Sequence, residues 1–505
     1  MIAGWLDKSV DVARGINLSA IESAIVLQGR SPSLVLDMVF ARRCLRHPLL
    51  RYRNGARCNS TSSPRKASVL KAPRLDIARI VENAAEVERN CLARNHPSLL
   101  STLPQILQAS NLRRKLLKDI TPLNVQRANL QKQITRTKDV LTRTRLLSQA
   151  LELKPKIAGL ESQVNLVDEQ LLSLCRDLPN FSHPNVPAHQ TEVGIINEPK
   201  QTPCVKHHVE IAESLGILDL IAAAKGSGHA WYYLKGMGVR LENALVSYAL
   251  DMAASRGWEL VKPPDVVRTE VALACGFRPR DEDGDQIYQL ANTTMEDAGE
   301  SADAGSLCLA GTAEIPLAAM FIDVTFPEEQ LPVKYVGVGT AYRAEAGSRG
   351  RGVKGLYRVH QFTKVELFAW TSVDQSDAML EEILQLQQDI VQGLGLYARI
   401  LDMSADELGN AASRKYDIEA WMYGRGGWGE VTSASNCTDY QSRRLNTRYR
   451  CLDGKCLFTH TLNGTAMAVP RMIIAILESG LREDGRVMVP EPLVKYMGVE
   501  MIGKM

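Results

Sequence analysis

The sequence predicts an α+β protein in which an N-terminal antiparallel helical coiled-coil arm precedes a domain built on a mainly antiparallel sheet. Two observations support this fold class. Between 153 and 178, aliphatic residues recur at alternating spacings of four and three, the pattern of a coiled-coil seam. After about Lys206, short strand patterns and helical patterns follow one another, which is typical of an α+β domain.

Composition places the chain among globular proteins. It has 505 residues, 45% of them hydrophobic and 23% charged, and a formal net charge of +3. No run of 18 apolar residues occurs, so we expect no membrane span. The ten cysteines are scattered without a CxxC pair or a Cys/His cluster, which predicts reduced structural thiols and no zinc site. A bound metal should therefore lie on carboxylates.

The N-terminal segment, residues 1–74, is predicted to be a transit peptide or a disordered extension. Residues 38–73 hold seven arginines, two lysines and no acidic residue, a composition typical of mitochondrial transit peptides. The preceding 37 residues contain four acidic residues, which is unusual in such a signal. We therefore expect Met38 to be the working start, with Met1 as the alternative, and the mitochondrial matrix as the destination. An ordinary disordered basic tail is the competing interpretation.

The helical arm is predicted from 75 to 187. After a short helix at Leu75–Asn95, the first limb follows a looser seam over 116–141 and the second limb a strict seam over 153–178, with a turn near Thr142–Arg145. Pro122 and Pro155 should kink the limbs or end a turn early. The sequence LPNFSHPNVP then ends the arm and begins a linker.

The arm is also strongly basic. Residues 113–156 include twelve Lys or Arg against three acidic residues. A charge run on a long helix is usually only a solvated face. An excess this one-sided on a projecting arm instead favours binding to a nucleic-acid backbone.

The second domain, residues 188–505, contains the predicted sheet. Helices are expected at 208–220, 240–257, 375–394 and 470–477. Strands are expected at 258–261, 287–290, 307–310, 333–345, 357–371 and 430–433.

Candidate chemistry gathers between Gly339 and Phe368. Arg343 and Glu345 alternate, which predicts a cation and an anion on one face of a strand. Phe362 and Glu366 share a face of the following strand, about 13 Å apart at roughly 3.3 Å per residue, and could hold the two ends of an elongated ligand. The loop between them carries glycines among Arg349, Arg351 and Lys354, a composition suited to phosphates.

Three other segments complement this stretch. Thr312 and Glu314 could bind an ammonium group. Glu430, with the Ser433 oxygen, could hold Mg²⁺. Arg471 lies at the expected start of a helix, where the dipole opposes a cation, so we interpret it as held there for a ligand anion.

A further glycine pattern, GRGGWG at 424–429, matches a dinucleotide fingerprint by letter. The strand-like residues that follow it exclude that interpretation, because the fingerprint requires a helix.

Several ordered motifs together resemble the class II seryl-tRNA synthetases over about 75–498. They are GTAYRAEAGSRGRGVKGLYRVHQFTKVE, the TAE triplet at 312–314, SNCTDYQSRR at 435–444 and NGTAMAVPRMIIAILES from Asn463. The resemblance implies a serine–tRNA ligase with a class II catalytic domain at 188–505 and a tRNA-binding arm at 75–187. It also implies ATP, L-serine, tRNA(Ser) and Mg²⁺ as ligands and a homodimer. The transit-like start points to the mitochondrial, bacterial-type form.

The resemblance implies individual roles as well. Arg343 would bind the α-phosphate and the serine carboxylate, and Arg471 the γ-phosphate, which makes these two the implied catalytic residues. Thr312 and Glu314 would bind the serine ammonium, whereas Glu366 and Thr465 would read its hydroxyl end, with Ala313 completing the serine site. The implied ATP site comprises Arg343, Glu345, Val359, Phe362, Glu430, Val431, Thr432, Ser433 and Arg471.

In the same way, Glu430 and Ser433 would coordinate Mg²⁺, Glu345 would accept from the adenine amino group, and Phe362 would stack on adenine. Trp258–Pro264 corresponds to the dimer-interface motif. The implied tRNA contacts are Arg349, Arg351, Lys354, Arg113, Arg114, Lys132 and Arg136.

Departures from the family pattern are few: Gly352, Ala434 and Pro470, none of which removes a proposed ligand-binding side chain. Two alternatives stay open. A non-catalytic paralogue would be expected to have lost Arg343, Glu345, Glu366 or Arg471, and all four are present. A coiled-coil interaction protein would use its arm, and not its sheet domain, as the working part.

Overall fold

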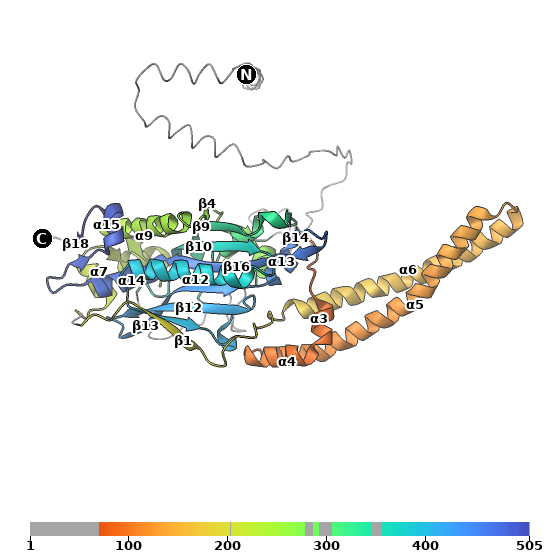
Figure 1. The fold of residues 1–505 in the computed structure, drawn as a ribbon, viewed down its shortest axis with the longest axis horizontal. Coiled ribbons are helices and arrows are strands. Elements are labelled where there is room, and N and C mark those ends of the chain that lie inside the picture. Colours follow the sequence, from red (N-terminus) through yellow and green to blue (C-terminus); the bar gives the residue numbers. More distant parts are fainter. Residues whose placement is uncertain (1–69, 202–203, 278–285, 292–305, 346–354, 504–505) are drawn as a thin grey trace, which may run out of the picture. The chain divides into compact units, whose positions relative to one another are not determined.

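The computed structural model describes residues 70–201, 204–277, 286–291, 306–345 and 355–503, all of which belong to one compact unit, Lys66–Met505. Their architecture confirms the predicted fold class: a helical arm precedes a domain built on an eight-stranded sheet (Figure 1). Most of the predicted N-terminal segment lies outside the described residues.

The large sheet has the order β1-β11-β12-β13-β16-β10-β9-β4 and is antiparallel except for the β4–β9 pair. In that order its strands are β1 (Thr191–Ile196), β11 (Ala398–Asp402), β12 (Arg414–Met422), β13 (Gly427–Asn436), β16 (His460–Ala468), β10 (Gln361–Thr371), β9 (Val333–Tyr342) and β4 (Glu259–Val261).

Four small sheets accompany it. They pair β2 (Leu218–Asp219) with β3 (Tyr233–Leu234), β17 (Val487–Met488) with β18 (Met501–Ile502), β5 (Val266–Arg268) and β6 (Gln289–Leu290) with β7 (Leu307–Leu309), and β8 (Thr325–Pro327) and β15 (Cys456–Phe458) with β14 (Arg448–Arg450). The helices of this domain are α7 (His208–Ser214), α8 (Leu220–Ser227), α9 (Met237–Ala254), α10 (Thr269–Ala274), α11 (Glu314–Ala319), α12 (Ser376–Gly393), α13 (Tyr440–Leu445), α14 (Val469–Gly480) and α15 (Glu491–Met497).

The main core lies between the sheet and three helices, α9, α12 and α14 (Figure 1). Along β10, Val365, Leu367 and Ala369 all belong to this core. Because successive side chains of a strand point to opposite faces, Lys364 and Glu366 turn to the other face of the sheet. That face carries the candidate site.

Several predicted elements have different bounds. The helix predicted over 208–220 ends at Ser214, since Gly216 takes a left-handed φ of 68° and the chain then enters β2. The strand predicted to reach residue 345 ends at Tyr342. Strands β11 and β12 were not predicted, although polar residues alternate with core residues along β12, a pattern that indicates a half-buried strand.

The arm consists of α3 (Ile77–Glu82), α4 (Ala84–Ala93), a 3₁₀ turn at Pro97–Ser101 and two long helices, α5 (Thr102–Arg136) and α6 (Val140–Arg176). The two long helices lie side by side, as the coiled-coil pattern predicts (Figure 1). Both continue past their internal prolines, Pro122 and Pro155, so neither proline ends a limb.

The turn of the arm lies earlier than predicted. Asp139 caps α6 by accepting the Thr142 N–H at 2.8 Å, so the second limb starts at Val140 and not after 145. Leu141, predicted on the first limb's seam, therefore belongs to the second limb and is 82% exposed. The prediction for this residue was wrong because a capping Asp fixed the helix start.

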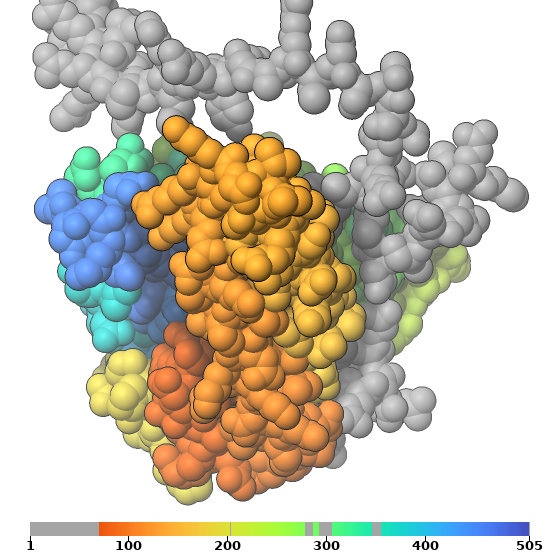
Figure 2. All heavy atoms as spheres, turned by 90° about the vertical axis from the view of Figure 1, so that its right-hand side faces the viewer, coloured from red at the N-terminus to blue at the C-terminus, as the bar shows by residue number. Residues whose placement is uncertain are grey.

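The seam itself divides into two apolar clusters. The near cluster, on the side of the sheet domain, joins α3, α4 and the adjoining halves of α5 and α6. The far cluster, toward the turn of the arm, consists of Leu130, Ile134, Leu146, Leu153 and Ile157. Outside these clusters the long helices present mainly polar side chains. The arm forms much of the face seen in Figure 2.

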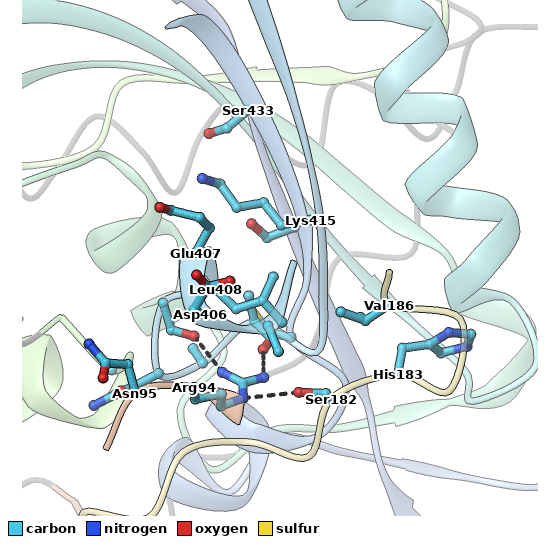
Figure 3. Close-up of a pocket in the computed structure, with 18 of the residues that line it drawn as sticks. Arg94, Asn95, Ser182, His183, Val186, Asp406, Glu407, Leu408, Lys415 and Ser433 are labelled. Atoms are coloured by element: carbon cyan, nitrogen blue, oxygen red, sulfur yellow. Dashed lines mark hydrogen bonds between the residues drawn. The ribbon is translucent and has the colours of Figure 1, made fainter. Parts of the chain in front are cut away.

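Two polar side chains join the arm to the sheet domain. The amide of Asn180 donates to the carbonyls of Ala411 and Cys437, both at 2.8 Å. Arg94, only 2% exposed, donates to the carbonyls of Gly409 and Ala412 and to Ser182 Oγ (Figure 3). Burial lowers the pKa of Arg94 to about 10, so the guanidinium stays charged at neutral pH.

Among the described residues, no helix combines the length and apolarity that a membrane crossing requires.

The far cluster of the arm can be tested by a pair of substitutions. Ile157 is 1% exposed, so Ile157→Ala should destabilise the arm by about 2–4 kcal/mol through reduced burial and a cavity. Leu151, on the same helix and 67% exposed, provides the control, and Leu151→Ala should change stability by less than about 0.5 kcal/mol. Chemical denaturation followed by circular dichroism measures both. Equal effects would contradict the seam.

Candidate active site

A cavity of about 1400 Å³ lies over the site face of the sheet. Its inner end is lined by Thr312, Glu314, Arg343, Lys364 and Ser433. Its outer end is lined by the root of the arm and by residues 405–412, including Arg94 and Glu407 (Figure 3). The cavity thus brings together residues from the three predicted segments near 312, 343 and 430.

Three buried polar groups form a network at the inner end. Lys364 Nζ lies 2.5 Å from Glu366 Oε2 and donates to Thr312 Oγ1 at 3.2 Å. Thr312 Oγ1 in turn donates to Glu366 Oε2 at 3.3 Å. Because buried charges are costly unless paired, the Lys364 ammonium compensates the Glu366 carboxylate in this dry position. Thr465 lies on β16 directly opposite Glu366.

Glu314 occupies the first turn of α11 beside this network. Its Oε1 accepts hydrogen bonds from Gln441 Nε2 at 2.6 Å and from Asn463 Nδ2 at 3.1 Å. Burial, and then the negative charge of Glu366, raise the pKa of Glu314 to about 7. A cation entering the cavity would stabilise its ionised form, so Glu314 is suited to binding an ammonium group.

Two arginines and one carboxylate form the second part of the site. Arg471 Nη1 lies 3.2 Å from Glu430 Oε2 and also donates to the Glu430 carbonyl at 3.0 Å. Burial, and then the charge of Arg471, lower the pKa of Arg343. Two guanidinium groups near enough to repel each other make a strong site for a polyanion.

Glu430 remains ionised over the whole physiological range. Burial would raise its pKa, but the positive charges of Arg471, Lys415 and Arg343 lower it to about 2. A β-bulge explains how it shares a face with Ser433. Because Val431 is the extra residue between the Glu419–Glu430 and Ile418–Thr432 pairs, residues three apart point to the same side.

The donor set of Glu430 and Ser433 fits the predicted Mg²⁺. A carboxylate of low pKa and a hydroxyl oxygen on one face are hard oxygen ligands. Thr432 does not join them, since its Oγ1 donates to the Thr465 carbonyl. The side chain of Val431 lies in the main core, so Val431 can reach a ligand only through its backbone.

The expected adenine end lies beside Arg343. Its guanidinium lies 5.4 Å from the centre of the Phe362 ring, and its Nε donates to the Gly311 carbonyl at 3.2 Å. Glu345 was predicted to lie on a strand, but it lies beyond the end of β9. It takes a left-handed φ of 48°, and its carboxylate pairs with Arg358 at 3.3 Å. The prediction that Arg343 and Glu345 share one face of a strand was therefore wrong, although both residues follow the end of the same strand.

Two residues of the site were not singled out from the sequence: Gln441 and Asn463. Lys364 precedes Glu366 by two positions, so strand alternation predicts it on the same face, but its ion pair with Glu366 was not predicted. Gln441 and Asn463 carried no such signal, because only the fold brings α13 and β16 against Glu314. Ala313 and Val359, both predicted, are almost fully buried.

The predicted tRNA-binding residues lie in two places. Arg349, Arg351 and Lys354 fall outside the described residues. On the arm, Arg114, Lys132 and Arg136 are exposed, whereas Arg113 forms an ion pair with Asp168 of the facing helix. Arg113 is therefore partly committed to holding the arm together.

One further group of side chains has the spacing of metal ligands: His207, His208 and Glu478. Both ring nitrogens of His208 already have protein partners, Glu478 at 3.1 Å and the Leu356 N–H at 3.1 Å. We therefore interpret His208 and Glu478 as a hydrogen-bonded pair and not as part of a metal centre. The cysteines within the described ranges are free thiols.

Comparison with known proteins agrees with this geometry. Residues 75–182 match the family model of the seryl-tRNA synthetase N-terminal domain, and residues 296–480 match that of the class II tRNA synthetase core domain for G, H, P, S and T. The mitochondrial serine–tRNA ligase of Schizosaccharomyces pombe is 44% identical over 84% of this chain and 88% of its own length. The serine–tRNA ligase of Rubrobacter xylanophilus is 42% identical over 85% of this chain and 99% of its own.

Solved structures give the same result. The seryl-tRNA synthetase of Pyrococcus horikoshii, complexed with ATP, superposes with a TM-score of 0.75 at 35% identity and covers 85% of this chain and 100% of its own. The cytoplasmic serine–tRNA ligase of Naegleria fowleri, in complex with AMP, gives 0.73 at 26% identity, over 85% and 98%. Matched in both domains and along most of its length, this chain belongs to the seryl-tRNA synthetase family.

Proposed function

We propose that this chain activates L-serine with ATP and transfers the seryl group to tRNA(Ser) in the mitochondrial matrix. One observation carries the proposal: the cavity that holds an ammonium site, Glu314 with Thr312, is also lined by Arg343, and Arg343 lies near enough to Arg471 to form a polyanion site with it. The family relationship supports the reaction, and relatives named mitochondrial support the compartment. The basic segment at 38–73 agrees with import.

The first step needs alignment more than acid–base chemistry. A serine carboxylate is already ionised at neutral pH, so it can attack the α-phosphorus directly, forming the acyl–phosphate bond as pyrophosphate leaves. Arg343 neutralises the α-phosphate and the serine carboxylate, and Arg471 takes the γ-phosphate. Phe362 stacks on adenine, Glu345 accepts from its amino group and Val359 lines the pocket.

Magnesium would be held by Glu430 and Ser433, and when bound it would supply charge neutralisation on the phosphates. Arg343 and Arg471, which both lie near the Glu430 carboxylate, would also neutralise charge on the nucleotide directly. Val431 and Thr432 complete this strand through their backbone.

Selection of serine depends on hydrogen bonding in a buried place. Glu366 and Thr465 read the hydroxyl, and a site built to bond a hydroxyl can reject the analogue lacking it by roughly 10⁴-fold or more. Alanine would lose the hydrogen bonds to the hydroxyl, whereas threonine must be excluded by space. Glu366 is nearly inaccessible to water, so no solvent hydrogen bond replaces the one that alanine lacks.

The second step requires tRNA. Residues 75–187 act as the arm that holds the tRNA body through phosphates and shape, and residues 188–505 act as the catalytic domain. Arg114, Lys132 and Arg136 are exposed on the arm for this contact, with Arg349, Arg351 and Lys354 at the acceptor end. A second copy of the chain pairs through Trp258–Pro264, since β4 is an edge strand and its Leu260 is 52% exposed.

Serine-dependent exchange of pyrophosphate into ATP tests the activity. The full chain should catalyse it with serine and not with alanine. Arg343→Ala should lower kcat by about 10² or more, because it removes a charged donor from the transition state. Exchange that fails in wild-type protein that still binds ATP would overturn the enzyme proposal in favour of a non-catalytic paralogue.

The pKa of Glu314 predicts a pH dependence for serine binding. Only the ionised carboxylate attracts an ammonium group, and its ionised fraction falls as pH drops through about 7. We therefore expect kcat/KM for serine to fall about tenfold per unit below that pH, as measured by exchange between pH 5.5 and 8.5.

Glu314→Gln should abolish this dependence and lower kcat/KM at pH 8. Glu407, at the outer end of the same cavity, provides the matched control. Glu407→Gln should keep the profile of the wild type. A profile that survives in Glu314→Gln would contradict the assignment.

The arm can be tested by shortening it. Deleting residues 122–157 and joining the helices with a short glycine linker removes the far cluster and leaves the near cluster intact. Serine-dependent exchange should persist, and tRNA charging should collapse. Loss of exchange in a folded variant would show that the domain division is wrong.

A same-length variant isolates charge from length. Lys132→Gln with Arg136→Gln should raise KM for tRNA and reduce the slope of log K against log salt by about 0.7–0.9 for each phosphate that is no longer neutralised. An unchanged slope would favour a protein-interaction role for the arm.

A further inference from the structure

A buried carboxylate lies two helical turns beyond Arg471 on α14. Glu478 is seven positions after Arg471, so both side chains leave the same face of the helix. Glu478 accepts the backbone N–H groups of His208 at 3.0 Å and Gly424 at 2.8 Å, and a longer one from Arg425 at 3.4 Å. It therefore holds the start of α7 and the β12–β13 turn together.

The His208 ring extends this group to a third segment. Its Nε2 accepts the Leu356 N–H at 3.1 Å, so that nitrogen carries no proton, and Nδ1 donates to Glu478 Oε1 at 3.1 Å. The ring is buried and uses both nitrogens. His208 thus connects α14 to the chain that enters β10.

Two glycines show how closely these segments approach. A Cβ on Gly355 would lie 2.2 Å from His208 Nε2, and Gly355 has a φ of 74°, which other residues rarely adopt. A Cβ on Gly424 would lie 2.1 Å from the Lys206 carbonyl. Both segments held by the His208–Glu478 pair therefore need glycine at the point of contact.

Besides Glu430, Arg471 contacts a residue of the held segments. Tyr357, directly after Leu356, accepts from Arg471 Nε through its carbonyl at 3.4 Å, and its ring centre lies 4.8 Å from the Arg471 guanidinium. The Arg425 guanidinium also lies over that ring, 4.0 Å from its centre, and the backbone N–H of Arg425 donates to Glu478. Tyr357 and Arg425 are thus both fixed by the same buried pair.

We propose that His208 is a positioning residue for nucleotide binding: by holding the Leu356 N–H, it sets the place of Tyr357 and through it the Arg471 guanidinium. This inference rests on the proposed function, in which Arg471 takes the γ-phosphate. His208 touches no substrate, and its effect reaches the nucleotide only through the Leu356–Tyr357 backbone. Serine binding, which uses Thr312, Glu314 and Glu366, does not depend on it.

Two conservative variants separate the two hydrogen bonds of the ring. In His208→Gln the side-chain oxygen reaches the Nε2 position and can still accept the Leu356 N–H. In His208→Asn the amide reaches only the Nδ1 position, so it can serve Glu478 but leaves Leu356 unpaired. Each variant removes one hydrogen bond, so a purely structural role would affect both alike.

The measurement is serine-dependent ATP–pyrophosphate exchange by the full chain, with KM determined separately for ATP and serine. His208→Asn should raise KM for ATP about tenfold, the effect of one unpaired buried N–H, and leave KM for serine within about twofold. His208→Gln should stay within about twofold of wild type for both. The shift of the unfolding midpoint by ATP, measured without catalysis, should be smaller in His208→Asn than in His208→Gln.

Equal KM values for ATP in the two variants would overturn the proposal, as would a parallel rise of KM for serine in His208→Asn. Wild-type protein without serine-dependent exchange would instead overturn the proposed function. In that case the ATP-induced shift of the unfolding midpoint still decides the role of His208: a smaller shift in His208→Asn than in His208→Gln supports it, and equal shifts exclude it.

Discussion

The alternation of side chains along β10 is the constraint on which the rest of the site depends. Val365, Leu367 and Ala369 are packed into the main core, and this packing commits Lys364 and Glu366 to the opposite face. A slip of one residue in register would bury two charges among apolar helices and expose the core residues, at a cost of several kcal/mol. The helices behind the sheet therefore fix the chemistry in front of it, and one of them, α14, also carries Arg471.

Two bulges adjust this alternation where the site needs it. On β13 the extra residue Val431 lets Glu430 and Ser433 face the cavity together, and on β16 the extra residue Ala466 lies between the positions opposite Val365 and Glu366. Without the bulge on β13, either Glu430 or Ser433 would point into the core. Bulges re-aim side chains at the expense of a local irregularity, and both irregularities here lie in strands that line the site.

The parts of this molecule that follow a local period were predictable from sequence: the coiled-coil seam, the alternation in β10 and the start of α14. The arm's turn was misplaced because a single capping Asp139 outweighed the seam pattern. Strands β11 and β12 were missed, although the alternation along β12 is a strand pattern. The partners of Glu314 could not be predicted at all, since Gln441 and Asn463 reach it only through the folded sheet. The same holds for His208, whose sequence context gives no sign of Glu478.

The contacts of Arg94 and Asn180 bear on how separable the two halves of the chain are. Side chains from the arm's root satisfy the carbonyls of Gly409, Ala411, Ala412 and Cys437, so the loop at 409–412 relies on groups encoded more than 200 residues earlier. A catalytic domain cut free at residue 187 would leave these carbonyls without their donors. The part of the arm that can be exchanged independently of the sheet domain therefore begins beyond the near cluster. Replacing the arm with that of a relative would succeed only if the native root, with Arg94 and Asn180, stayed in place.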